Sequence, residues 1–121
     1  MNIKAIYPGT FDPTTFGHEV LVKRASNIFE SVFVAVAYKT QKNTLFSFEE
    51  RFDMCEEVLK KYTNVKVIKL DKLTVDHANE LDAKVMLRGL RAVSDFEYEV
   101  QLSNLNRAMN PKIESIFLSP D

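Results

Sequence analysis

Short apolar runs alternate along this chain with longer segments in which apolar residues recur every three or four positions. The short runs are rich in β-branched residues, which is typical of strands buried on both faces of a sheet. They predict strands at residues 3–7, 32–37, 65–70, 84–87 and 113–118. The first longer segment predicts a helix, because one face collects His18, Leu21, Val22, Ala25, Ile28 and Phe29.

Capping signals predict where the later helices begin. Ser47 is followed three residues later by Glu50, and Ser94 by Glu97, so each pair can form a capping box. The first box opens a helix whose apolar side holds Phe48, Phe52, Cys55, Leu59 and Tyr62. The second opens a helix with apolar residues at Tyr98, Leu102, Leu105 and Met109. Between these helices, Thr74 is placed to cap a short helix that runs to Leu81.

Strand and helical segments alternate four times before the fifth strand. This order predicts an α/β fold: a Rossmann-like, doubly wound, five-stranded parallel sheet with helices on both faces. Ligands of such sheets bind at the carboxyl ends of the strands, near the point where the strand order reverses. The chemistry is therefore expected in the segments that leave the strands: 7–18, 38–46, 71–74, 88–95 and the chain from 119 onward.

Composition narrows the classes of function. The 121 residues are expected to form one domain, residues 1–121, and a net charge of −1 argues against a nucleic-acid partner, although a local basic site stays open. No apolar run reaches the roughly 18 residues of a membrane span, so no membrane contact is expected. The lone Cys55 cannot form an intramolecular disulfide, which fits a cytoplasmic location. Two histidines and one cysteine without ligand spacing argue against a zinc site.

The loop that leaves the first strand carries the clearest candidate chemistry. Residues 7–18 read YPGTFDPTTFGH, which is neither the dinucleotide fingerprint nor a P-loop. They nevertheless put Gly9, Thr10 and His18 between a strand and the start of a helix, where free N–H groups favour anions. His18 is therefore expected to meet a phosphate, and Asp12 is expected to shape the loop rather than act as a base.

Two motifs give the chain a family resemblance. Residues 9–13, GTFDP, followed by Gly17 and His18, resemble the signature of nucleotidyltransferases with a T/H-x-G-H motif. Residues 88–99, RGLRAVSDFEYE, are similar to one family among them, phosphopantetheine adenylyltransferase. Lys42 and residues 48–51 also fit that family.

The resemblance implies a reaction and its partners. The family transfers the adenylyl group of ATP to 4′-phosphopantetheine, which gives dephospho-coenzyme A and pyrophosphate in the penultimate step of coenzyme A synthesis. It implies Mg²⁺ with the triphosphate, affinity for dephospho-coenzyme A or coenzyme A, and a homo-oligomer, usually a hexamer.

The resemblance also implies site residues. Catalysis is expected from His18, Thr10, Lys42 and Arg91, with His18 stabilising the transition state. The 4′-phosphopantetheine is expected at Thr10, Lys42, Thr74 and Arg88. ATP is expected at Thr10, Phe11, His18, Gly89, Leu90, Arg91 and Glu99.

Elementary chemistry is consistent with these roles. Attack of one phosphate on another gathers negative charge, so positioning and charge stabilisation suffice without a covalent protein group. Lys42, Arg88, Arg91 and His18 are expected to act as cationic donors at one edge of the sheet. Cys55 is expected to be buried in the packing of its helix, and His77 is expected on the surface.

The chain also departs from the family pattern. Family members continue into a Ser-rich segment that binds the β- and γ-phosphates, whereas this chain stops at Asp121, so a truncated member is expected. Phe16 and Tyr38 stand where Asn and a small residue are common. The alternatives are another T/H-x-G-H nucleotidyltransferase, a nucleotide- or coenzyme A-binding module without turnover, and an assembly fragment with exposed apolar surface.

Overall fold

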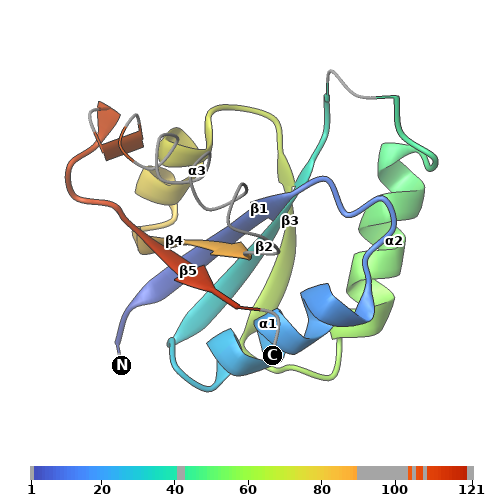
Figure 1. Ribbon diagram of the computed structural model, residues 1–121, viewed down its shortest axis with the longest axis horizontal. Coiled ribbons are helices and arrows are strands. Elements are labelled where there is room, and N and C mark those ends of the chain that lie inside the picture. The colour runs from blue at the N-terminus through green and yellow to red at the C-terminus, as the bar shows by residue number, and fades with distance from the viewer. Residues whose placement is uncertain (1, 41–42, 90–103, 105, 108, 120–121) are drawn as a thin grey trace.

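In the computed structural model, strands and helices alternate as the sequence predicts from residue 4 to residue 89, and a fifth strand follows (Figure 1). The structure describes all residues except 1, 41–42, 90–103, 105, 108 and 120–121. The elements are β1 Lys4–Gly9, α1 Phe16–Ser26, β2 Ser31–Ala37, α2 Phe48–Leu59, β3 Val65–Leu70, α3 Thr74–Glu80, β4 Ala83–Gly89 and β5 Glu114–Leu118. The capping box predicted at Ser94 lies outside the described residues.

All five strands pair in parallel, in the order β3-β2-β1-β4-β5. The predicted five-stranded parallel sheet is confirmed. The chain moves outward from β1 through β2 to β3, then returns to the other side of β1 for β4 and β5. The order therefore reverses between β1 and β4, and their carboxyl ends, at Gly9 and Gly89, meet at the expected ligand-binding edge.

Helices cover both faces of the sheet, as predicted. α1 and α2 lie on one face and α3 on the other (Figure 1). Alternate residues of β1 serve the two faces: Ala5 and Tyr7 pack with α1 and α2, while Ile6 packs with α3. Cys55 is buried against α1 and the strands, which confirms its predicted place in the core.

The helix starts agree with the predictions in α2 but not in α3. The Ser47 hydroxyl accepts the Glu50 N–H at 3.2 Å and the Glu50 carboxylate accepts the Ser47 N–H at 3.0 Å, which is the predicted capping box. The prediction that Thr74 caps α3 was wrong. Leu73 is the N-cap and makes no side-chain capping bond, and Thr74 is the first helical residue, one position past the site from which a hydroxyl caps.

The predicted face of α1 extends one turn too far. Leu21, Val22 and Ala25 are buried as expected, but the helix ends at Ser26 with Asn27 as its C-cap. Ile28 therefore lies beyond the helix and is 43% exposed. No helix in the described part of the chain is long and apolar enough to cross a membrane.

Candidate active site

The first turn of α1 fixes the side chain of His18. Its Nδ1 accepts the backbone N–H of Thr15 at 2.9 Å, while the backbone N–H of His18 donates to the Thr15 hydroxyl at 3.3 Å. The Thr15 hydroxyl also lies 3.1 Å from Nδ1, so Thr15 holds this nitrogen through both its backbone and its side chain. The expectation that His18 is a cationic donor stays a prediction, and Nε2 is the ring nitrogen that these contacts with Thr15 leave for it.

The aromatic rings of Phe11 and Tyr7 lie close to the His18 imidazole. The His18 ring centroid lies 4.9 Å from that of Phe11 and 6.4 Å from that of Tyr7. Phe11 is 3% exposed and its backbone has a φ of 53°, a left-handed conformation that costs energy for any residue with a side chain. Its ring thus belongs to the core, and the backbone of Phe11 is what remains for a ligand.

Because Gly9 has no side chain, the ring of Phe11 can pack directly against it. A Cβ added to Gly9 would lie 2.9 Å from Cε2 of the Phe11 ring, closer than carbon atoms approach. The absence of a side chain at the end of β1 therefore allows Phe11 to fold back beneath His18.

Arg88 and Gly89 lie beside this group. They are the last residues of β4 rather than part of a loop. A Cβ at Gly89 would lie 3.2 Å from Leu21 of α1 and 3.8 Å from the Tyr7 hydroxyl. Burial raises the pKa of Tyr7 to about 12, and the charge of Arg88 opposes part of that rise. Residues from β1, α1 and β4 thus meet at one edge.

Two charged residues shape the same edge from α2 and the first loop. The Asp12 carboxylate accepts the N–H groups of Leu45 and Phe46 at 2.7 and 2.9 Å, as expected of a loop-shaping residue. Arg51 is 2% exposed and donates to the carbonyls of Thr10, Ala37 and Phe46. Sequence reasoning missed this role of Arg51.

A cleft of about 410 Å³ lies at the carboxyl ends of β2 and β3. Its walls are Ala37, Tyr38, Lys39, Leu70, Asp71 and Lys72. The Tyr38 ring packs against Phe48 at 5.2 Å between centroids, and the Lys69 ammonium lies 3.8 Å from the Tyr38 ring. Tyr38 therefore forms one wall of the cleft and is held there by Phe48 and Lys69.

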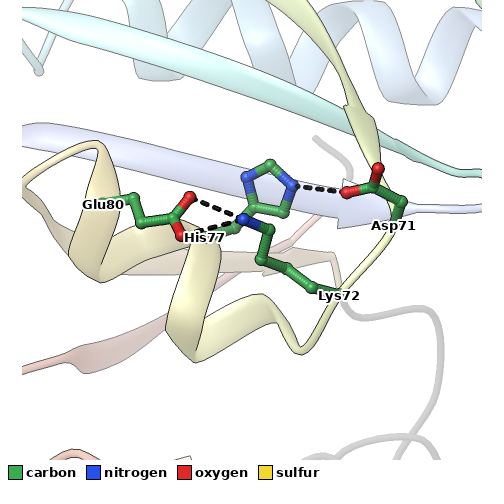
Figure 2. A network of polar contacts seen from close by, with 4 residues as sticks. All are labelled: Asp71, Lys72, His77 and Glu80. Carbon is green, nitrogen blue, oxygen red and sulfur yellow. Dashed lines mark hydrogen bonds and ion pairs between the residues drawn. The ribbon is translucent and has the colours of Figure 1, made fainter.

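Polar contacts from α3 hold one wall of this cleft (Figure 2). Asp71 lies 3.4 Å from Nε2 of His77, and the Lys72 ammonium donates to both Glu80 oxygens at 2.8 Å. The hydrogen bond to Glu80 raises the pKa of Lys72. The expectation that His77 lies on the surface was wrong: its side chain is 13% exposed, and its ring points toward Asp71 (Figure 2).

A family model described as cytidylyltransferase-like matches residues 6–120. A phosphopantetheine adenylyltransferase from Polynucleobacter necessarius is 53% identical over 116 residues, covering 96% of this chain and 70% of that protein. One from Hahella chejuensis is 54% identical over 115 residues, covering 95% of this chain and 71% of that protein. The chain belongs to the phosphopantetheine adenylyltransferase family.

Solved structures show the same fold at lower identity. A lipopolysaccharide core biosynthesis protein from Thermoplasma volcanium matches with a TM-score of 0.72 and 17% identity, covering 97% of this chain and 96% of that one. Plasmodium falciparum nicotinic acid mononucleotide adenylyltransferase, complexed with NaAD, matches with a TM-score of 0.66 and 16% identity, covering 98% and 75%. These likenesses establish the fold alone.

Some of the site residues predicted from the family resemblance lie together at the carboxyl ends of β1 and β4. They are Thr10, Phe11, His18, Arg88 and Gly89. Thr74 lies apart from them, half-buried at the first residue of α3 on the other face of the sheet. The remaining predicted residues, Lys42, Leu90, Arg91 and Glu99, lie outside the described residues. Among those described, no cluster of three or more His, Cys, Asp or Glu side chains could hold a metal ion.

A signal for Arg51 was present in the sequence. It falls one turn before Cys55 and one turn after Phe48, on the side of α2 that the apolar spacing marks as buried. A charged residue on a buried face needs hydrogen-bond partners, and neighbouring loop carbonyls are available at a strand edge.

Proposed function

We propose that this chain transfers the adenylyl group of ATP to 4′-phosphopantetheine, giving dephospho-coenzyme A and pyrophosphate. The observation that carries the proposal is the identity of 53–54%, over at least 95% of the chain, with proteins named phosphopantetheine adenylyltransferase. The arrangement of His18, Arg88 and the start of α1 supports it, because hydrogen-bond donors gather there.

The proposed reaction is a direct displacement. An oxygen of the acceptor phosphate attacks the α-phosphorus of Mg-ATP, and the bond from that phosphorus to the bridging oxygen breaks, so that pyrophosphate leaves. No protein nucleophile is required. Burial raises the pKa of Cys55 to about 11, so that the thiol stays protonated and out of reach.

His18 is proposed to act as a hydrogen-bond donor through Nε2. Because Thr15 holds Nδ1, the imidazole needs no reorganisation as charge grows on the phosphoryl oxygens. The first N–H groups of α1, at Phe16 and Gly17, have no acceptor within the helix and favour an anion at the same place. Arg88 is proposed to bind the acceptor phosphate, and Lys42 and Arg91 to add further positive charge.

Mg²⁺ is proposed to arrive with the triphosphate as part of the substrate. Thr10 and the backbone of Phe11, with Gly89, Leu90, Arg91 and Glu99, are proposed to face ATP. Thr74 and the cleft at β2 and β3 are proposed to lie along the path of the pantetheine arm.

The test measures pyrophosphate release by the chain with Mg-ATP and 4′-phosphopantetheine. Turnover is expected with this acceptor and not with nicotinamide mononucleotide or glycerol 3-phosphate. His18→Ala is expected to lower kcat by about 10²–10³-fold, the effect of losing one donor aimed at developing charge. Lys60→Ala, which removes an exposed pair with Glu57 on α2, serves as the control and should keep full turnover.

Two results would contradict the proposal. Equal or faster release with nicotinamide mononucleotide would indicate another nucleotidyltransferase. Binding of coenzyme A in calorimetry with no pyrophosphate from any acceptor would indicate a binding module. A homohexamer and a cytoplasmic location stay predictions, of which the first is checked by light scattering.

A further inference from the structure

The buried guanidinium of Arg51 joins three separate segments of the chain. From α2, Nη1 donates to the Thr10 carbonyl at 2.9 Å and to the Ala37 carbonyl at 2.8 Å, while Nε donates to the Phe46 carbonyl at 3.2 Å. Thr10 belongs to the loop after β1, Ala37 ends β2 and lines the cleft, and Phe46 precedes α2. Arg51 thus ties the first loop to the cleft wall.

Asp12 completes this connection from the opposite side. Its carboxylate accepts the N–H of Phe46, and Arg51 binds the carbonyl of the same residue. Phe46 is therefore held through both of its backbone polar groups, once from the first loop and once from α2. The segment that follows Lys42 in sequence is fixed against the loop that carries Thr10.

The bond to Thr10 also sets the orientation of the next peptide. In a planar trans peptide the carbonyl oxygen and the amide hydrogen point to opposite sides. With the Thr10 carbonyl drawn toward Arg51, the N–H of Phe11 must point away from it. The Phe11 ring packs against His18 and the φ of Phe11 is 53°, a left-handed conformation that is unfavourable for a residue with a side chain.

We propose that Arg51 is a positioning residue for adenylyl transfer, which orients the Thr10–Phe11 peptide so that the Phe11 N–H faces the substrate phosphates. The inference rests on the proposed function and extends it to a residue that touches neither substrate. Arg51 orients the peptide through its guanidinium group, which donates hydrogen bonds to the carbonyls of Thr10, Ala37 and Phe46.

The choice of arginine follows from what the three carbonyls require. They come from different segments, and a planar guanidinium can reach them with several fixed donors, whereas a lysine carries one nitrogen. Among the described residues, no carboxylate forms an ion pair with Arg51. A buried charge without a counter-charge is costly, and the three carbonyl bonds that offset this cost are the same bonds that fix the loop geometry.

The test compares Arg51→Met, Arg51→Lys and Asp12→Asn with the control Ser47→Ala. Methionine keeps much of the volume and removes the three bonds, while lysine keeps the charge and loses the fork. Asparagine keeps the shape of Asp12 but can accept only one of its two N–H bonds. Ser47→Ala removes the N-cap bond of the same helix and leaves the Arg51 contacts in place, so it reports what weakening α2 alone does to turnover.

Pyrophosphate release gives kcat and KM for each variant at a temperature where all are folded. Arg51→Met is expected to lower kcat about 100-fold relative to Ser47→Ala, as displacement of a reacting group by about 1 Å does. Arg51→Lys is expected to stay within about threefold of Arg51→Met, because charge alone does not orient the peptide. Asp12→Asn is expected to lower kcat about tenfold.

The thiol of Cys55 reports whether the fold around Arg51 survives. It is fully buried one helical turn away, and the charge of Arg51 influences it, so slow reaction with Ellman's reagent indicates an intact α2. If Arg51→Met exposes the thiol, the proposal is judged from the kcat of Arg51→Lys and Asp12→Asn instead. Full kcat in Arg51→Lys, or a kcat in a protected Arg51→Met no lower than in Ser47→Ala, overturns the proposal.

A failure of the proposed function is recognised separately. If the unmodified chain releases no pyrophosphate, that function fails, and Arg51 is then judged by calorimetric binding of Mg-ATP alone. The dissociation constant is expected to rise about tenfold in Arg51→Met and to stay unchanged in Ser47→Ala. An unchanged constant in Arg51→Met overturns the role of Arg51, and no binding by the unmodified chain overturns both proposals.

Discussion

Alkaline pH is expected to destabilise the fold through two buried acids beneath the site. Burial raises the pKa of Cys55 from 9.0 to about 11 and that of Tyr7 from 10.0 to about 12. Each group stays protonated in the folded chain at a pH where it ionises in the unfolded chain. Above pH 9 the unfolded state therefore binds fewer protons than the folded state, so stability falls as pH rises.

The size of the effect follows from the shifts. Two pKa units correspond to about 2.7 kcal/mol for each group, present below its unfolded pKa and lost as pH passes its folded pKa. For Cys55 the linkage relation gives a loss of about 1.9 kcal/mol by pH 10.5. Together the two acids remove about 4.5 kcal/mol between pH 9 and pH 12, which is comparable to the whole stability of a small domain.

Urea unfolding followed by circular dichroism at pH 8 and pH 10.5 measures this loss. In Cys55→Ala the Cys55 part should disappear, so the free energy of unfolding should fall by about 1.9 kcal/mol less than in the unmodified chain. Equal losses in the two proteins would refute the reasoning. At pH 8 the folded thiol should also react with iodoacetamide at least about 100-fold more slowly than the thiol in urea, from its thiolate fraction alone.

Three substitutions test other parts of the structure. Gly9→Ala puts a Cβ 2.9 Å from the Phe11 ring, so it should displace His18 and lower kcat at least about tenfold in pyrophosphate release; unchanged kcat would contradict the packing. Arg88→Ala should weaken 4′-phosphopantetheine binding in calorimetry before it affects ATP, and equal affinity would remove it from the acceptor site. Asn64→Ala loses donors to the carbonyls of Ser26 and Phe29, and urea unfolding should show a loss of about 1–3 kcal/mol. No change would show that these bonds do not hold the turn between α1 and β2 against the start of β3.

The strands were predictable because burial on both faces restricts which residues they can contain. A parallel strand covered by helices on both faces must be apolar at nearly every position, and β2, Ser31–Ala37, has that pattern. The start of α2 was equally local, since Ser47 and Glu50 form their capping box without help from the rest of the chain.

Predictions failed where distant contacts decide. The periodic face of α1 continued to Ile28, but the chain must turn there to enter β2, and the helix ends at Ser26. His77 sits in a helix of seven residues that is too short for a clear periodic pattern, and its burial depends on Asp71 in another segment. Sequence spacing alone does not show such contacts.

In the candidate site, too, residues that are close in sequence could be predicted, whereas contacts between distant residues could not. Gly9, Thr10 and His18 lie close together in sequence, at the end of β1, in the loop after it and in the first turn of α1, so a short motif was enough to place them together. Arg51 binds Thr10, which is 41 positions away in sequence, and Ala37, which is 14 away, so its role depended on the fold. The orientation of the His18 ring also required the structure, because it is set by the contacts of Nδ1 with the N–H and hydroxyl of Thr15.

The charged groups around the first loop act mainly on backbone rather than on one another. Asp12 accepts backbone N–H groups, Arg51 donates to backbone carbonyls, and Nδ1 of His18 accepts a backbone N–H. A salt bridge can form between any two side chains of opposite charge. These hydrogen bonds instead require the short carboxylate of Asp12, the branched guanidinium of Arg51 and the ring of His18. The geometry that would face the phosphates is therefore set by residue shape as much as by charge, which explains how a chain with a net charge of −1 can present a site suited to anions.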